Sequence, residues 1–149
     1  MTTDELQLLA IQAAVTAGLD PALICAICAN ESGFEQYAVR YEPAFYVRYI
    51  ENMVGLSATE KTMRATSFGL MQIMGQVARE QGFDGKYLTE LFDPETNLYR
   101  GCKKFKSCLD RENGDVNAAL LRYNGGGNPG YPALVLAHYS TYEHFKTET

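Results

Sequence analysis

The residue with the clearest potential for chemistry is Glu31, which stands two positions before Gly33, where an apolar helix is expected to end. A carboxylate at the carboxyl end of a helix faces unpaired carbonyl groups and the negative end of the helix dipole, and both disfavour its ionised form. Ile24 and Ile27, about one turn earlier, would raise its pKa further by desolvation. A carboxyl group that stays protonated near neutral pH can act as a general acid in the cleavage of a glycosidic bond. The simpler alternative is a solvated glutamate at a helix end.

A second segment, Gly69-Leu70-Met71-Gln72-Ile73, holds side chains suited to binding a sugar. Its glycine would let the backbone approach a ligand closely. Met71 could pack on a sugar face, and the amide of Gln72 could bind hydroxyl or acetamido groups. Read alone, the segment is the ordinary apolar start of a helix, and Leu70 and Ile73 are expected in the core under either interpretation.

A third segment, Tyr123-Asn124-Gly125-Gly126, follows a short apolar helix. The Tyr123 hydroxyl could hydrogen-bond the Glu31 carboxyl and hold its orientation. Asn124 offers both a donor and an acceptor, as an N-acetyl group requires. A plain helix end also explains the Asn-Gly pair, and the two interpretations are compatible.

Hydroxyl and aromatic side chains supply the remaining candidates. Ser32 could orient the Glu31 carboxyl, contact the substrate, or make only a hydrogen bond within the helix end. The chain has ten tyrosines and no tryptophan, and sugar rings stack on aromatic faces. The floor of a sugar cleft could be formed by Tyr41, Phe45, Tyr46 and Tyr131. We select Tyr46 and Tyr131 among them, while packing in or beside the core accounts for most of the aromatic residues.

A hydrolase of the lysozyme type would need a second carboxylate at a defined distance from the acid. Glu35 follows Glu31 by four positions, but the expected helix break separates them. Glu42 lies in a predicted loop, where an ion pair with Arg40 or Arg48 is the simpler interpretation. None of these has a better claim to catalysis than to its ordinary role, which favours a reaction that needs one carboxylate.

Taken together, Glu31-Ser32-Gly33, Gly69-Leu70-Met71-Gln72-Ile73 and Tyr123-Asn124-Gly125-Gly126 resemble the motifs of the lysozyme-like catalytic domain of soluble lytic transglycosylases, including related bacteriophage enzymes. The resemblance covers about residues 19–142. One departure is Arg122, because the family commonly has a small residue before the tyrosine.

This resemblance implies a substrate and a mechanism. The substrate would be the peptidoglycan glycan strand, cleaved between N-acetylmuramic acid and N-acetylglucosamine. Glu31 would be the single catalytic acid and base, and a 1,6-anhydromuramic acid product would form without consuming water. No cofactor or metal is implied. A hydrolytic muramidase, or a non-catalytic wall-binding or tail-structural module of the same fold, remains an alternative.

Helix signals dominate the elements that must position these residues. Thr2 with Glu5, Asp20-Pro21, Ser57 with Glu60, Asp93-Pro94 and Asp115 each predict a helix start. The run after Gly69 is expected to lead into a helix that ends near Gly82. Small β turns could lie between residues 34 and 41 or 66 and 72. We therefore predict one lysozyme-like, all-α domain over residues 1–149, with at most minor β structure.

Composition excludes several other classes of protein. A chain of 149 residues with 46% hydrophobic and 21% charged residues can bury a core. Its net charge of -5 argues against nucleic acid as a partner, and no apolar run is long enough to insert in a membrane. The basic run 103–106 fits the solvated face of a helix.

The four cysteines, Cys25, Cys28, Cys102 and Cys108, could suggest a metal or redox site. The Cys25-x-x-Cys28 pair lies in a regular apolar helix, and no second half-site of zinc spacing follows. Small buried core thiols are therefore the favoured interpretation, with a disulfide between the pairs left open.

The amino terminus lacks the basic region and cleavage site of a secretory signal. Synthesis in the cytoplasm and delivery to the cell wall or periplasm by another route are therefore expected. The resemblance points to a phage virion or a lysis system as that route, with a specialised bacterial secretion apparatus as the alternative.

Overall fold

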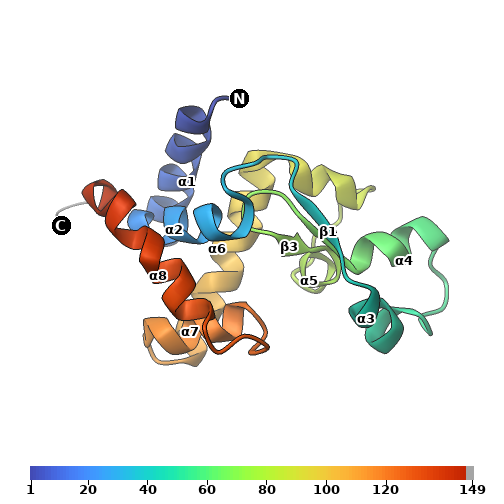
Figure 1. The fold of residues 1–149 in the computed structure, drawn as a ribbon. Helices are drawn as coiled ribbons and strands as arrows, with labels where there is room; N and C mark the ends of the chain where they lie inside the picture. Colours follow the sequence, from blue (N-terminus) through green and yellow to red (C-terminus); the bar gives the residue numbers. More distant parts are fainter. Residues whose placement is uncertain (147–149) are drawn as a thin grey trace.

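The computed structural model describes residues 1–146 and divides into a larger helical part and a smaller part built around a short sheet (Figure 1). The central helix α2 (Pro21–Ser32) packs against both α1 and α8, and its carboxyl end points toward the sheet (Figure 1). The other helices of the larger part are α1 (Thr3–Ala17), α6 (Pro94–Arg111), α7 (Val116–Tyr123) and α8 (Tyr131–Tyr142), followed by the short 3₁₀-helix η3 (Glu143–Phe145).

The smaller part contains an antiparallel sheet in the order β1-β2-β3, with strands β1 (Val39–Tyr41), β2 (Thr66–Phe68) and β3 (Ile73–Met74). Around it lie α3 (Pro43–Phe45), η1 (Tyr46–Ile50), α4 (Ala58–Arg64), α5 (Gly75–Glu80) and η2 (Leu88–Phe92). A mainly helical, lysozyme-like domain with minor β structure is therefore confirmed. The strands fall in or beside the two stretches where β turns were expected.

Helix α2 has the boundaries that its sequence predicts. The Asp20 side chain accepts a hydrogen bond from Ala22 N at 2.9 Å, and Pro21 occupies the first helical position. Gly33 ends the helix in the left-handed conformation, with φ of 60°. Every residue from Pro21 to Cys28 is buried, so α2 is a core helix whose last turn alone reaches the surface. Glu31 lies on that turn.

The segment after Gly69 leads into a helix that ends near Gly82, as predicted, but it does so through a turn and a short strand. Residues 69–72 form a turn that leads into β3, and α5 begins only at Gly75. Gly69 has φ of 72°, and a Cβ atom there would lie 2.6 Å from Asn97 Nδ2. The close approach of α6 therefore requires glycine and a turn at this position.

Asn97 on α6 holds that turn in place. Its Oδ1 accepts a hydrogen bond from Met71 N at 2.9 Å, and its Nδ2 donates to Phe68 O at 2.7 Å and Leu91 O at 2.9 Å. The side chain is fully buried. Because an amide has both donors and an acceptor, one residue satisfies backbone groups from three segments.

A second close contact joins α6 to the same turn. Gly101 lies in the middle of α6, and a Cβ atom there would lie 2.2 Å from Met71 Sδ. Met71 is itself fully buried. The helix can approach the turn this closely only because position 101 has no side chain.

All four cysteines are buried and free, as the core-thiol interpretation predicts. Burial raises the pKa of Cys25 and of Cys102 to about 12, so both are neutral thiols.

Within residues 1–146, no three His, Cys, Asp or Glu side chains gather as a metal site would require. Among the helices of the same residues, none has the length and apolar character needed to cross a membrane.

Candidate active site

Glu31 lies in a cleft of about 320 Å³ between the helical part and the sheet. Its carboxyl group is partly buried, and this desolvation raises its pKa above the ordinary value of 4.5. A hydrogen bond from Tyr131 and the positive charges of Lys104 and Arg40 oppose the rise without cancelling it. Glu31 is therefore suited to donate a proton.

Tyr131, the first residue of α8, holds the Glu31 carboxyl group. Its hydroxyl donates a hydrogen bond of 2.6 Å to Glu31 Oε1. Burial and the neighbouring carboxylate raise the pKa of Tyr131, so the phenol keeps its proton and acts as a donor. Since Oε1 accepts this bond, an acidic proton on Glu31 belongs on Oε2. Tyr131 was selected as a stacking candidate, but it is only 4% exposed and orients the acid instead.

Tyr123 does not make the hydrogen bond to Glu31 that its sequence position suggested. Its buried hydroxyl donates to Met71 O at 2.7 Å instead. That bond ties the end of α7 to the turn at residues 69–72. Tyr123 also lines the cleft, so it contributes a wall while Tyr131 takes the orienting role.

Ser32 and Met71 both act within the protein. The Ser32 hydroxyl lies 3.0 Å from Cys28 O and 2.8 Å from Leu70 O, bridging the end of α2 to the turn. The Met71 side chain is fully buried and is absent from the cleft lining, so it does not present a face to a sugar. Met71 contributes its backbone groups, which Asn97 and Tyr123 bind.

Gln72 and Asn124 line the cleft, as a role in substrate binding requires. Gln72 has φ of 51°, an unusual conformation for a residue other than glycine, and its Nε2 donates to Ala38 O and Gly69 O, both at 3.1 Å. These bonds fix the amide and use its donors within the protein. Asn124, at the end of α7, is exposed and has its amide available to a ligand.

Tyr46 is not among the cleft residues. It lies at the start of η1, where its ring is 6.2 Å from that of Tyr41 and 5.9 Å from Lys61 Nζ. Phe45, the residue before it, lines the cleft in its place. The one-residue difference arises because the chain turns helical at Pro43, so adjacent side chains point in different directions.

A second carboxylate, Glu42, lies in the same cleft as Glu31. Arg40 Nε lies 3.0 Å from Glu42 Oε1, which is the ion pair that the sequence favoured. Arg40 also lines the cleft, and its side chain is largely exposed. The two carboxyl groups thus have opposite settings, since Glu31 is desolvated whereas Glu42 is paired and partly open to water.

Lys104 is a charged cleft residue that sequence reasoning missed, and Ser67, Met74 and Val77 also line the cleft without having been predicted. The basic run 103–106 was assigned to a solvated helix face, and Lys103 and Lys106 are exposed as expected. Lys104 is instead partly buried and lines the cleft with Glu31. The available signal was the helical period, because Lys104 lies three positions after Gly101 and next to the buried Phe105.

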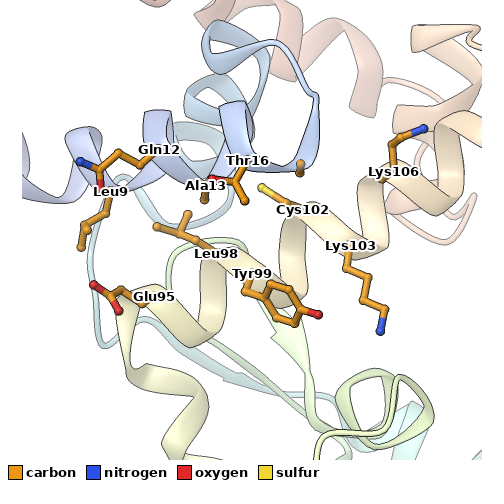
Figure 2. Close-up of a pocket in the computed structure, with 11 residues that line it drawn as sticks. Leu9, Gln12, Ala13, Thr16, Glu95, Leu98, Tyr99, Cys102, Lys103 and Lys106 are labelled. Carbon is orange, nitrogen blue, oxygen red and sulfur yellow. The ribbon is translucent and has the colours of Figure 1, made fainter.

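A larger hollow lies elsewhere, in a groove of about 600 Å³ between α1 and α6 (Figure 2). Ala13 and Leu98 lie near its middle, Leu9 and Glu95 toward one end, and Lys103 and Lys106 toward the other (Figure 2). None of the predicted site residues lines this groove. Its charged lining residues, Glu95, Lys103 and Lys106, are all exposed, whereas Glu31 is partly buried, so the smaller cleft with Glu31 is the candidate active site.

Comparisons with known proteins agree with the architecture. The family model for the transglycosylase SLT domain matches residues 8–132. A curated relative named "Transglycosylase", from Enterobacteria phage PRD1, is 44% identical over 62 residues, which make up 42% of this chain and 21% of the relative. The match thus spans only about a fifth of that relative's length. No solved structure matches the chain significantly. Since the family model covers most of its length, the chain belongs to the transglycosylase SLT domain family.

Proposed function

We propose that this protein is a peptidoglycan lytic transglycosylase in which Glu31 is the single general acid and base. The observation that carries the proposal is the sheltered Glu31 carboxyl group in a cleft, held by the Tyr131 hydroxyl at 2.6 Å. The substrate would be the β-1,4 bond between N-acetylmuramic acid and N-acetylglucosamine, as in the family that the chain resembles. No cofactor takes part in this scheme.

In the first half of the reaction, the proton on Glu31 Oε2 passes to the glycosidic oxygen as the bond breaks. Positive charge develops on the muramic acid ring, and the acetamido oxygen of the same sugar captures the anomeric carbon. No protein nucleophile is needed. Tyr131 keeps its hydrogen bond to Oε1, which strengthens as the carboxyl group becomes an anion.

In the second half, ionised Glu31 accepts the proton of the muramic acid 6-hydroxyl group, and that oxygen attacks the anomeric carbon. The carbon–oxygen bond to the acetamido group breaks, and the 1,6-anhydro ring closes. Glu31 regains its proton, so the cycle balances without water. We propose that Asn124, Gln72 and the cleft wall formed by Tyr123 hold the sugar during both halves of the reaction.

The position of Glu42 supports one alternative function, hydrolysis of the same bond, because it puts a second carboxylate in the cleft. Arg40 places a cation beside its carboxylate, and a carboxylate can serve as the base that activates water. The alternative function is a hydrolytic muramidase acting on the same bond with Glu31 as acid and Glu42 as base. We place it second because the ion pair already gives Glu42 a structural role.

Two substitutions decide between these functions. Glu31→Gln should reduce the rate of clearing of a peptidoglycan suspension by at least about 100-fold, while binding to sacculi persists. Glu42→Gln should leave a substantial rate and the 1,6-anhydro product, detected by mass spectrometry of the released muropeptides. Glu35→Gln, which changes an exposed carboxylate four positions after Glu31 in the chain, is the matched control.

The outcomes against the proposal are distinct. Unchanged clearing by the Glu31→Gln variant would show that Glu31 is not the acid. Products with reducing-end muramic acid, lost in Glu42→Gln, would establish the hydrolase. Sacculus binding with no cleavage by the wild type would identify a wall-binding or tail-structural module.

The catalytic core is proposed to span about residues 19–142, within a single domain of residues 1–149. The phage relative and the family resemblance support delivery to the wall in a virion or through a lysis system. The proposed partner is the glycan strand itself, without nucleic acid or membrane insertion. Antibody labelling of purified virions, or its failure, tests the virion route.

A further inference from the structure

Lys104 needs a physical explanation because it is a cation placed in the candidate active site. The lysines on either side of it along the helix surface, Lys103 and Lys106, are exposed, whereas Lys104 is partly buried beside Glu31. Removing an ammonium group from water is costly unless it is paired or hydrogen-bonded. The contacts of Lys104 show what offsets that cost.

The ammonium group binds the end of α7. Lys104 Nζ donates to Tyr123 O at 2.8 Å and lies 4.1 Å from the centroid of the Tyr123 ring. Tyr123 is the last residue of α7, so its carbonyl belongs to the negative end of the helix dipole. A cation at this place gains from the carbonyl, the dipole and the ring face together. Lys104 thereby fixes the wall that Tyr123 forms.

The same ammonium group places a positive charge near Glu31. Its charge lowers the pKa of Glu31. Burial lowers the pKa of Lys104 below its ordinary value, and the Glu31 charge opposes that change in part. Among the residues that the structure describes, Lys104 donates to Tyr123 O and not to the Glu31 carboxyl group, which Tyr131 binds. Its influence on Glu31 is therefore electrostatic and does not compete with the acidic proton for a carboxyl oxygen.

The other groups around Glu31 leave Lys104 as its main cation. Tyr123 on α7, Tyr131 on α8 and Cys28 on α2 all have raised pKa values and are neutral. Arg40 on β1 is positively charged, but it is exposed and paired with Glu42, whose negative charge in the same cleft offsets it.

The groups that face Lys104 from its other side complete this account. Cys108, on the same helix, has a raised pKa and is neutral. Arg122 on α7 is paired with Glu112 at 2.6 Å. Beyond these two, the hollow on that side is lined by the charged residues Glu80, Lys103 and Arg111.

We propose that Lys104 is a positioning residue that holds α7 against α6 and supplies the fixed positive charge that favours ionised Glu31 in the second half of the reaction. This inference rests on the proposed function of Glu31. The two half-reactions make opposite demands, since shelter from water keeps the acid protonated but makes its anion unstable. A cation that lines the cleft stabilises the Glu31 anion without exposing the Glu31 carboxyl group to water.

Lys104→Met tests this proposal, with Lys104→Arg as the conservative variant and Lys103→Met as the matched control. Loss of the Lys104 charge should raise the Glu31 pKa, and so move the alkaline limb of the rate of wall clearing to higher pH by about half a unit or more. Lys104→Arg keeps the positive charge and should show the same alkaline limb as the wild type. Lys103→Met removes the same charge from an exposed position and should leave the limb in place.

Titration of the Glu31 side-chain carboxyl by ¹³C NMR in the free protein gives a second readout, which does not depend on activity. If Lys104→Met does not fold, Lys104→Gln removes the charge and keeps a donor for Tyr123 O. An unchanged Glu31 pKa in the folded neutral variant would overturn the proposal and leave only a structural role. An equal shift in Lys103→Met would also overturn it, because general net charge would then be the cause. Failure of the proposed function shows separately, as full clearing by Glu31→Gln.

Discussion

The two sides of the cleft hold their carboxyl groups in opposite ways. On the helical side, Glu31 is sheltered and receives a hydrogen bond from the buried Tyr131. On the sheet side, Glu42 is paired with Arg40, whose side chain is mostly exposed. The first carboxyl group has a raised pKa because of burial, whereas the second has a cation and water to support its charge. Glu31 lies on a core helix and Glu42 lies just after an edge strand, and this difference in location determines which carboxyl group is suited to be the acid.

The backbone on the two sides of the cleft also differs, in how many hydrogen bonds tie it to the rest of the protein. The turn at residues 69–72 is tied to α2, α6 and α7 by Ser32, Asn97 and Tyr123. Strand β1 is exposed at all three of its residues, and pairs only with β2. We therefore expect changes on the helical side to affect both stability and activity, and changes at Arg40 or Glu42 to have much smaller effects on stability.

The largest effect on stability is expected from a substitution of Asn97, which hydrogen-bonds the turn at residues 69–72 on the helical side of the cleft. Asn97→Ala would leave three buried backbone groups without their partners and should lower the free energy of unfolding by about 3 kcal/mol. Urea denaturation measures it. Asn117→Ala, at an exposed position on α7, is the control and should change stability by less than about 0.5 kcal/mol. Equal effects of the two substitutions would contradict the assigned role of Asn97.

Tyr131→Phe should produce the next largest effect, on activity. It removes the hydrogen bond to Glu31 Oε1, which is strongest when Glu31 is ionised, and should slow wall clearing by roughly tenfold or more. The Glu31 pKa should rise further, because this bond favours the anion. Tyr139→Phe is the control, since Tyr139 on the same helix binds Asp20 at the opposite end of α2. A similar loss in both variants would show that α8 packing, rather than the bond to Glu31, is responsible.

Glu31→Gln should make the folded protein more stable at neutral pH, by roughly 1–4 °C in Tm. The pKa of Glu31 is raised above 4.5 on folding, so the native state binds its proton more tightly than the unfolded chain does. The resulting stability is fully present below about pH 4.5 and is lost as pH rises through the folded-state pKa. Melting temperatures measured across pH should therefore separate the two proteins above this range and bring them together below it. A gap that stays constant with pH would show that ionisation of Glu31 is not its cause.

Arg40→Met should have the smallest effect of the set. Exposed ion pairs contribute about 0–1 kcal/mol, so the free energy of unfolding should change by less than about 1 kcal/mol. The alkaline limb of activity should move upward slightly, and less than in Lys104→Met, because Arg40 also favours ionised Glu31 but is screened by water. A larger shift for Arg40 than for Lys104 would reverse the assigned ranking of the two cations.

Local sequence signals predicted the elements well, because helix starts are governed by nearby residues. Asp20, Ser57, Asp93 and Asp115 each cap the helix that was assigned to them. The position of Glu31 at the end of a core helix followed from the same signals. These features depend on contacts within a few residues, so one sequence is enough to predict them.

The partners of the site depend on contacts across the fold and could not be predicted in the same way. Tyr123 and Tyr131 are both tyrosines near glycines, and only the packing of α8 on α2 decides that Tyr131 reaches Glu31. The turn after Gly69 looked like a helix start because its apolar residues suit either state, and the approach of Asn97 selects the turn. Lys104 was assigned to the surface because a run of lysines on a helix is usually exposed. Its position around the axis of α6 instead directs it into the cleft.

The contact between Gly101 and Met71 has a consequence for protein engineering. Replacing a glycine inside a helix with alanine is a common route to thermostability, with a gain of roughly 0.5–1 kcal/mol. Here the added methyl group would collide with the Met71 sulfur and push α6 away from the turn below Glu31. A stabilisation campaign guided by helix propensity alone would therefore select a substitution that deforms the surroundings of the candidate active site, and position 101 should be kept unchanged in any such library.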